Sequence, residues 1–250
     1  MPAMKIHLRS VRPCSVLLPL TAGLLLGAGA ARAQLAPGEY ITQNGWGVLK
    51  IEALTGGTQK FAIEAMGANA HTCSLDGAIR GRQARIPTGD KEPPCVVDFV
   101  AKADGVDVQP KSDDACRSFC GARARFEGMY NKPAPGCRVA EIGKTRTAFK
   151  QQYDKKSYAE ARATLGPLLA NCGKTLTDID EGWIRNDLAI TLYRLGEAAE
   201  CQRVLEPLKE LAAMTPKQIE ENYPPSDAQN QAPIARAARA NLNLCKGGKK

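Results

Sequence analysis

Two similar 16-residue segments occur in the second half of this chain, related by a constant shift of 40 residues. YDKKSYAEARATLGPL (Tyr153–Leu168) aligns with YRLGEAAECQRVLEPL (Tyr193–Leu208), and Tyr, Ala, Glu, Leu, Pro and Leu coincide. An internal period of 20–50 residues is typical of stacked supersecondary units that bury a shared apolar face. Each copy predicts two helices around a tight turn, with Lys156 or Gly196 at the turn. The second half of the chain is therefore expected to be helical.

The first 33 residues have the pattern of a secretory signal peptide. An apolar run over residues 16–30 follows three basic residues and precedes a small-x-small cleavage motif that ends at Ala33. A membrane-spanning helix needs about 20 apolar residues, whereas this run is shorter and is broken by Pro19 and by glycines. We expect cleavage before Gln34, no membrane span in the mature chain, and a periplasmic or secreted product.

The charge of the mature chain gives little support to nucleic-acid binding. The signal segment carries four of the 34 basic residues and none of the 26 acidic residues, so the mature charge is 30 − 26 = +4 rather than +8. A charge this modest gives little support to the strongly basic, aromatic-lined surfaces that are typical of nucleic-acid-binding proteins. The mature chain is long enough for two domains of about 100 residues each.

Eight cysteines follow the signal segment: Cys73, Cys95, Cys116, Cys120, Cys137, Cys172, Cys201 and Cys245. An even number of cysteines in an exported chain predicts disulfides rather than free thiols or a metal site. His71 is the single mature histidine and no CxxC pair occurs, so we expect no metal and no cofactor. Five cysteines precede residue 140 and three follow it. If all are oxidised, an odd number of bridges joins the two halves.

The first half of the mature chain alternates apolar and polar residues with period two, from Gly38 to about Ala103. The glycine-containing dipeptides Gly56-Gly57, Asp76-Gly77 and Asp104-Gly105 are expected to be turns between short strands. This pattern predicts a small disulfide-bonded antiparallel β-domain, a barrel or a sandwich, over residues 34–137. Trp46, between two glycines, is interpreted either as a plug of this core or as an exposed recognition residue.

The segment that follows the predicted strands is rich in cysteine, arginine and aromatic residues. Arg117, Arg123 and Arg125 are candidates for an anion-binding cluster. The alternative is a disulfide-pinned strand and turn whose arginines face water, which is the more common role of such charges. Both interpretations stay open from the sequence.

The second copy of the repeat resembles the tetratricopeptide repeat. Leu188, Ala189, Leu192, Tyr193 and Gly196 occupy the apolar, small, apolar, aromatic and glycine positions of that repeat, and the resemblance covers about residues 145–213. It implies a helical-hairpin scaffold of the kind used for protein binding. The fold class expected for the whole chain is α+β, with a helical domain over residues 138–250 that ends in a disordered tail.

Two further features complete the helical half. Thr215-Pro216 is expected to begin a short helix, and residues 233–245 a last helix, with a polar loop over residues 224–232 between them. Because consecutive helices in a hairpin stack are antiparallel, we expect the bridges Cys201–Cys245 and Cys137–Cys172, the second of which joins the two domains. For the remaining cysteines we expect Cys73–Cys95 and Cys116–Cys120.

The sequence offers few ingredients for catalysis. It contains no GxSxG motif, no glycine-rich phosphate loop and no HExxH motif. The acidic cluster Asp178, Asp180 and Glu181 is compatible with a carboxylate-based cell-wall hydrolase, although acids at a predicted helix start more often complement the helix dipole. We therefore expect a protein that is not an enzyme.

Three classes of function remain. The first is a non-catalytic interaction protein: an adaptor, inhibitor or immunity-type binder of another exported protein or acidic macromolecule. The others are a small-ligand-binding β-barrel protein and the cell-wall hydrolase. In the repeat that this chain resembles, the first helix of each hairpin lines the hollow, partner-binding face. The resemblance implies that this face carries Trp183, Asn186, Ile190, Tyr193, Arg194, Arg146, Lys150 and Tyr153.

Overall fold

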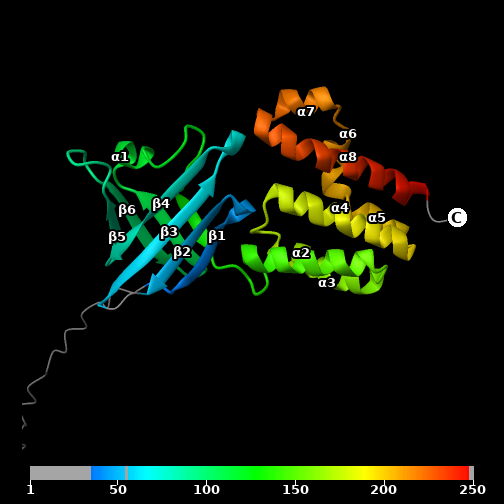
Figure 1. Ribbon diagram of the computed structural model, residues 1–250, viewed down its shortest axis with the longest axis horizontal. Coiled ribbons are helices and arrows are strands. Elements are labelled where there is room, and N and C mark those ends of the chain that lie inside the picture. Colours follow the sequence, from blue (N-terminus) through cyan, green and yellow to red (C-terminus); the bar gives the residue numbers. More distant parts are fainter. Residues whose placement is uncertain (1–34, 54–55, 248–250) are drawn as a thin grey trace, which may run out of the picture. The chain divides into compact units, whose positions relative to one another are not determined.

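The computed structural model describes residues 35–53 and 56–247, so that the predicted signal peptide and C-terminal tail lie outside the described residues. An antiparallel β-barrel is followed by a series of helices, which is an α+β arrangement (Figure 1). All of the described residues belong to one compact unit. A division into domains at residue 137 therefore stays a prediction.

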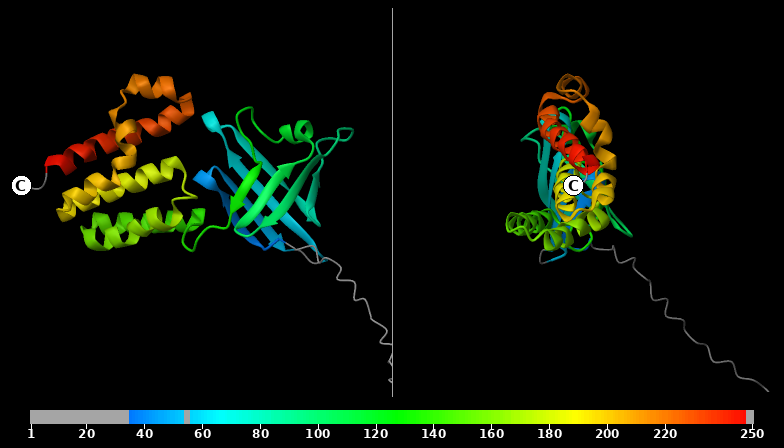
Figure 2. Two further views of the ribbon diagram at one scale, coloured as in Figure 1. Left: turned by 180° about the vertical axis from the view of Figure 1, so that it is seen from behind. Right: turned by 90° about the vertical axis from the view of Figure 1, so that its right-hand side faces the viewer.

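The barrel is formed by strands that follow one another around it in chain order (Figures 1 and 2). Their bounds are β1 Gly38–Thr42, β2 Gly47–Ala53, β3 Thr58–Met66, β4 Thr72–Arg80, β5 Gln83–Ile86, β6 Cys95–Lys102, β7 Gly105–Pro110 and β8 Gly128–Asn131. Each strand pairs antiparallel with the next, and β8 pairs with β1, with Thr42 opposite Tyr130, to close the barrel. Of the two predicted architectures, the structure shows the barrel.

Period-two alternation fills the inside of the barrel with side chains. Leu49, Ile63, Val97 and Val108 have no exposed surface, because every second residue of a strand points to the same face of the sheet. Across the interior, the rings of Phe61 and Phe99 lie with centroids 4.7 Å apart. In an eight-stranded barrel the interior is just wide enough for side chains or for one small ligand, and here side chains occupy it.

One of the three predicted glycine turns is wrong. Asp76-Gly77 lies within β4, where Gly77 is opposite Phe61 on β3. A Cβ atom at Gly77 would lie 3.3 Å from Cε1 of Phe61. The glycine therefore makes room for an aromatic ring on the neighbouring strand and does not turn the chain. By contrast, Asp104 lies in the turn that precedes β7.

The barrel continues beyond the predicted end of the alternating pattern near residue 103. The arginine-rich segment contains a short helix, α1 (Asp113–Arg117), and leads into β8. Arg117 donates to the carbonyl oxygens of Ala122 and Ala124, at 2.7 and 3.4 Å, so its guanidinium organises the main chain around it.

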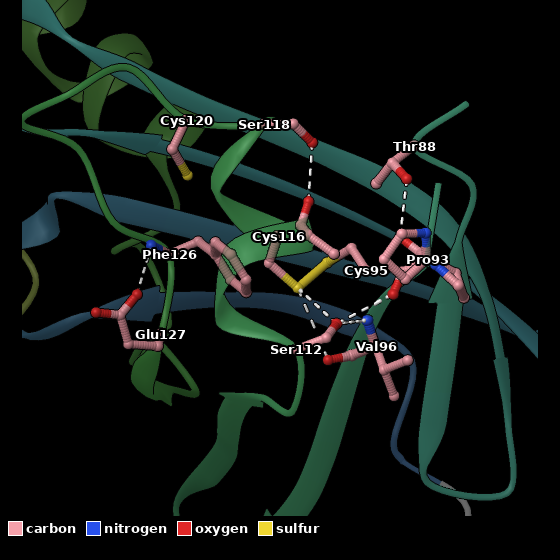
Figure 3. The surroundings of a disulfide bond; sticks show 12 residues. Thr88, Pro93, Cys95, Val96, Ser112, Cys116, Ser118, Cys120, Phe126 and Glu127 are labelled. Atoms are coloured by element: carbon pink, nitrogen blue, oxygen red, sulfur yellow. Dashed lines mark hydrogen bonds between the residues drawn. A yellow bond between two sulfur atoms is a disulfide. The ribbon is translucent and has the colours of Figure 1, made fainter. Parts of the chain in front are cut away.

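The disulfides that attach this segment are Cys73–Cys120 and Cys95–Cys116, so the predicted Cys73–Cys95 and Cys116–Cys120 pairs are wrong. Cys73 is on β4 and Cys95 is on β6, and β5 lies between them in the sheet. The α1 segment returns across these strands and bonds to each separately. Figure 3 shows the second bridge, beside which the Ser112 hydroxyl accepts from the Val96 N–H at 2.8 Å.

The second half of the described chain is helical. The α-helices are α2 Val139–Asp154, α3 Tyr158–Cys172, α4 Asp178–Leu195, α5 Ala198–Val204, α6 Lys209–Ala213, α7 Pro216–Asn222 and α8 Pro225–Gly247. In space α2 packs on α3, α3 on α4, and α4 on both α5 and α8 (Figures 1 and 2). The predicted polar loop over residues 224–232 is wrong, because α8 already begins at Pro225.

The two copies of the repeat have matching structures. Lys156 and Gly196, 40 residues apart, both end a helix with a left-handed backbone, at φ 62° and 81°. Leu165 and its counterpart Leu205 both lie in the core with no exposed surface. The predicted bridges Cys137–Cys172 and Cys201–Cys245 are present, and Cys137–Cys172 is the odd bridge that the parity argument places across residue 140.

Candidate functional site

The candidate site lies where the first helices of the two hairpins, α2 and α4, approach each other. Arg146 of α2 reaches across to α4, where its guanidinium lies 3.2 Å from Asp180 and 3.8 Å from Asp187. Thr177 caps α4, because its hydroxyl oxygen accepts from the Asp180 N–H at 3.0 Å. This cap places Asp180 in the first turn of α4, within reach of Arg146.

Beside this contact is a cavity of about 570 Å³, which we name the α2–α4 hollow. It is lined by Gly143, Arg146, Thr147, Phe149, Lys150, Tyr153, Asp154 and Asp187. Phe149 is buried, with 5% of its surface exposed, and its ring centroid lies 5.8 Å from that of Tyr153. The ring centroid of Tyr153 in turn lies 5.2 Å from that of Tyr158 on α3. The hollow thus combines an aromatic wall with charged groups.

The charged groups of the hollow are paired with one another. Lys150 donates to Asp154 at 2.9 Å, and this hydrogen bond raises the pKa of Lys150. Burial raises the pKa of Asp187 to about 6, although Arg146 and Lys150 oppose the shift by favouring the carboxylate. A hydrogen bond with Tyr153 raises the pKa of Arg194. The charged side chains of the hollow therefore form ion pairs with one another.

The structure brings together four of the eight residues that the resemblance selects. Arg146, Lys150 and Tyr153 line the hollow, and Arg194 is hydrogen-bonded to Tyr153. The other four are on α4 and do not line the hollow: Trp183, Asn186, Ile190 and Tyr193. Of these, Trp183, Ile190 and Tyr193 are half-buried.

Asn186 does not lie on an open face. Only 3% of its surface is exposed, and its amide donates to the carbonyl oxygens of Gly182 and of Ile234, the latter on α8. Helix α8 packs on the side of α4 that the repeat resemblance assigns to a partner, and it fills that position within the chain. Adjacent residues on a helix point about 100° apart, so the next residue, Asp187, faces the hollow instead.

Sequence reasoning did not select Asp187, Phe149, Thr147 or Gly143. The 40-residue shift contains a usable signal, because Thr147 and Asp187 are equivalent positions and both line the hollow. By the same shift, Gly143 in the first copy is equivalent to Trp183 in the second. A Cβ atom at Gly143 would have no atom within 4 Å, so the missing side chain leaves this part of the hollow open.

The residues considered for other functions have structural contacts. Glu181 pairs with Arg185, and Asp180 pairs with Arg146 and Thr177, so these carboxylates stabilise α4 and its neighbours. Trp46 is half-buried against the barrel core, with its ring centroid 6.3 Å from that of Tyr130. Arg125 of the arginine-rich segment lies 3.5 Å from Glu127.

Across residues 35–53 and 56–247, no three or more His, Cys, Asp or Glu side chains are grouped as a metal site would require. The helices in these ranges also include none with the length and apolar character to cross a bilayer.

A comparison of the chain with protein-family models, with curated proteins and with solved structures found no match.

Proposed function

We propose that this protein is an exported, non-catalytic interaction protein. It binds another exported protein through the α2–α4 hollow. The observation that carries the proposal is the gathering of Arg146, Lys150 and Tyr153 around one cavity. Arginine and tyrosine are enriched at the energetic centres of protein interfaces. The adaptor, inhibitor and immunity-type roles all use such a surface.

The helical scaffold supports this proposal. The two repeat copies are related by 40 residues, and the helices that precede their turns, α2 and α4, both contribute to the hollow, α2 with most of the lining and α4 with Asp187. We therefore assign the helical half a tetratricopeptide-like role, in which the first helices present the binding residues. Such scaffolds bind extended segments of partner proteins on a concave surface.

The expected partner carries acidic groups. A carboxylate of the partner can replace Asp187 beside Arg146, and a second can replace Asp154 beside Lys150. Tyr153 adds an apolar ring surface with a polar hydroxyl. Complementary charge of this kind contributes to the specificity and to the rate of association.

The four disulfides indicate an oxidising compartment. We propose in addition that the chain is exported by a signal peptide that is cleaved before Gln34, to the periplasm or to the medium. The intact mass of the secreted product tests this step. A product that still contains residues 1–33 would contradict it.

Two substitutions to leucine allow a sharp test of the hollow itself. Gly143 on α2 lines the hollow, whereas Ala163 on α3 lines a separate cavity between α3, α4 and α5. Both positions are exposed, and a Cβ atom at Gly143 would have no atom within 4 Å. Leucine is a good helix former, better than glycine by about 0.8 kcal/mol. Both Gly143→Leu and Ala163→Leu should therefore fold, while only the first fills the hollow.

The experiment captures partners from an extract of exported proteins on the immobilised protein, identifies them by mass spectrometry, and measures binding to each purified partner. We expect Gly143→Leu to lower the affinity at least tenfold and Ala163→Leu to leave it unchanged. Equal affinity of both variants and the wild type would show that the hollow is not the binding site.

A further inference from the structure

Asp187 occupies the position in the hollow that an acidic partner would take. It extends from α4 toward α2, and a carboxylate oxygen lies 3.8 Å from the Arg146 guanidinium. One third of its side chain is exposed, at 33%. It is thus buried enough to interact with Arg146 and exposed enough to be displaced.

The groups that act on Asp187 come from one neighbouring helix. Of the helices packed around α4 in the described chain, α2 supplies the charges that influence Asp187, namely Arg146 and Lys150. Each of these cations has a second carboxylate, Asp180 for Arg146 and Asp154 for Lys150. Asp187 is therefore the carboxylate that both cations share.

Asp187 also sets the charge of the hollow. The charged residues that line the cavity are Arg146, Lys150, Asp154 and Asp187, whose formal charges sum to 2 − 2 = 0 when all are ionised. With Asp187 protonated the sum becomes +1. Because burial raises the pKa of Asp187 to about 6, this change occurs between neutral and mildly acidic conditions.

We infer that Asp187 is a built-in competitor of the acidic partner, so that the hollow binds a carboxylate-bearing peptide more tightly when Asp187 is uncharged. This inference rests on the proposed function and adds its regulation. Protonation of Asp187 frees Arg146 from one of its two carboxylates and removes a repulsive charge from the binding surface. Acidification of the compartment to which the protein is exported then strengthens its binding to the acidic partner.

An oligo-aspartate decapeptide is a suitable probe, because its side chains, with ordinary pKa values near 3.9, stay largely ionised at pH 5. Fluorescence anisotropy with the labelled peptide is measured at pH 7.5 and pH 5.0 in low salt. For the wild type we expect roughly three- to tenfold tighter binding at pH 5.0, the effect of one charge within about 6 Å. Asp187→Asn should bind at pH 7.5 as tightly as the wild type does at pH 5.0, without further change on acidification.

Two variants make the outcome specific. Asp154→Asn also removes one negative charge from the hollow, and it should keep the wild-type dependence on pH because Asp187 is still present. Gly143→Leu should abolish binding at both values of pH.

The possible results separate the inference from the function on which it rests. If Gly143→Leu abolishes peptide binding but the wild type binds equally at both values of pH, or Asp187→Asn keeps the pH dependence, the inference is overturned and the binding site stands. If the peptide binds neither the wild type nor any variant, or if it binds Gly143→Leu as well as the wild type, acid recognition by the hollow is overturned together with the inference.

Discussion

The backbone N–H of Asn69 donates a 3.0 Å hydrogen bond to the carboxylate of Asp227, 158 positions further along the chain. The Asn69 side-chain oxygen in turn accepts from the Ser226 N–H at 3.1 Å. Asn69 lies between β3 and β4 with φ 59°, and Ser226 and Asp227 are in the first turn of α8. A turn of the barrel thus satisfies an N–H group that the start of a helix leaves unpaired.

Replacement of Asn69 should destabilise the protein, and the loss should depend on how well the new residue tolerates the positive φ at this position. Asn69→Ala removes the cap and replaces asparagine, which tolerates the left-handed conformation, with alanine, which tolerates it less well, so we expect the free energy of unfolding to fall by about 2–3 kcal/mol. Asn69→Gly removes the cap but tolerates the positive φ, and should cost about 1 kcal/mol. Urea unfolding measures both, and equal losses would contradict the contribution of backbone strain.

The buried pair of Asn186 and Asn241 should contribute to stability and not to partner binding. The Asn241 amide donates to the side-chain and main-chain oxygens of Asn186, at 3.0 and 3.1 Å. Asn186→Ala removes the buried side-chain hydrogen bonds to Ile234 and Asn241 of α8, so we expect a loss of about 1–3 kcal/mol in the free energy of unfolding.

Two measurements separate this role from binding. In a double-mutant cycle, Asn186→Ala with Asn241→Ala should cost less than the sum of the single variants, because the two side chains share a hydrogen bond. The affinity of folded Asn186→Ala for a partner should equal that of the wild type. A reduced affinity at unchanged stability would place Asn186 in the binding site after all.

Asp187 should make the folded state less stable as the pH rises. Its pKa is raised to about 6 in the folded protein from 3.8, so the folded state binds more protons than the unfolded state between these values. The contribution of Asp187 to stability is then fully present below pH 4 and is lost as the pH rises through 6. Because Asp187 is partly exposed, we expect Asp187→Asn to raise the free energy of unfolding at pH 7.5 by only about 1 kcal/mol.

The matching measurement is at pH 4, where Asp187 is protonated in the folded protein and the variant should differ little from the wild type. Chemical unfolding at both values of pH gives the comparison. A variant that is less stable than the wild type at pH 7.5 would show that the ion pair with Arg146 outweighs the effect of burial.

Removal of the bridge between Cys137 and Cys172 should be costly. The two residues are 35 positions apart and both are buried, and a loop of this length corresponds to about 4 kcal/mol in the chain-entropy description. We expect Cys137→Ser with Cys172→Ser to lower the free energy of unfolding by about this amount. Hydrogen exchange should then increase first at the start of α2 and the end of α3, and a loss below about 1 kcal/mol would contradict the prediction.

Local patterns were sufficient to predict the class of each half of the chain. Alternation of apolar residues predicts strands because successive side chains point to opposite faces, and the inward set that includes Leu49 and Ile63 is buried as this rule requires. The repeat predicts the turns at Lys156 and Gly196 because equivalent residues have equivalent environments. Antiparallel stacking of consecutive helices was enough to predict Cys201–Cys245.

The failures share a different cause. The pairing of Cys73 with Cys120 depends on how the segment around α1 returns across the barrel, and spacing in the sequence contains no information on that path. Asp76-Gly77 has the sequence of a turn, but Gly77 lies in a strand and makes room for the ring of Phe61 on the neighbouring strand. In the same way, the face of Asn186 is covered by α8, which is 39 or more residues further along the chain.

The sequence by itself predicted an export signal, and it determined the two-residue alternation of the strands and the 40-residue repeat of the helices, because these patterns depend on residues close together in the chain. Only the tertiary structure decided which side of α4 stays open. Packing of α8 buries Asn186, and the approach of α2 brings Arg146 to Asp187 and forms the hollow. These outcomes depend on contacts between distant segments, and in such contacts a step of one residue along a helix exchanges a buried position, such as Asn186, for one that lines the hollow, such as Asp187.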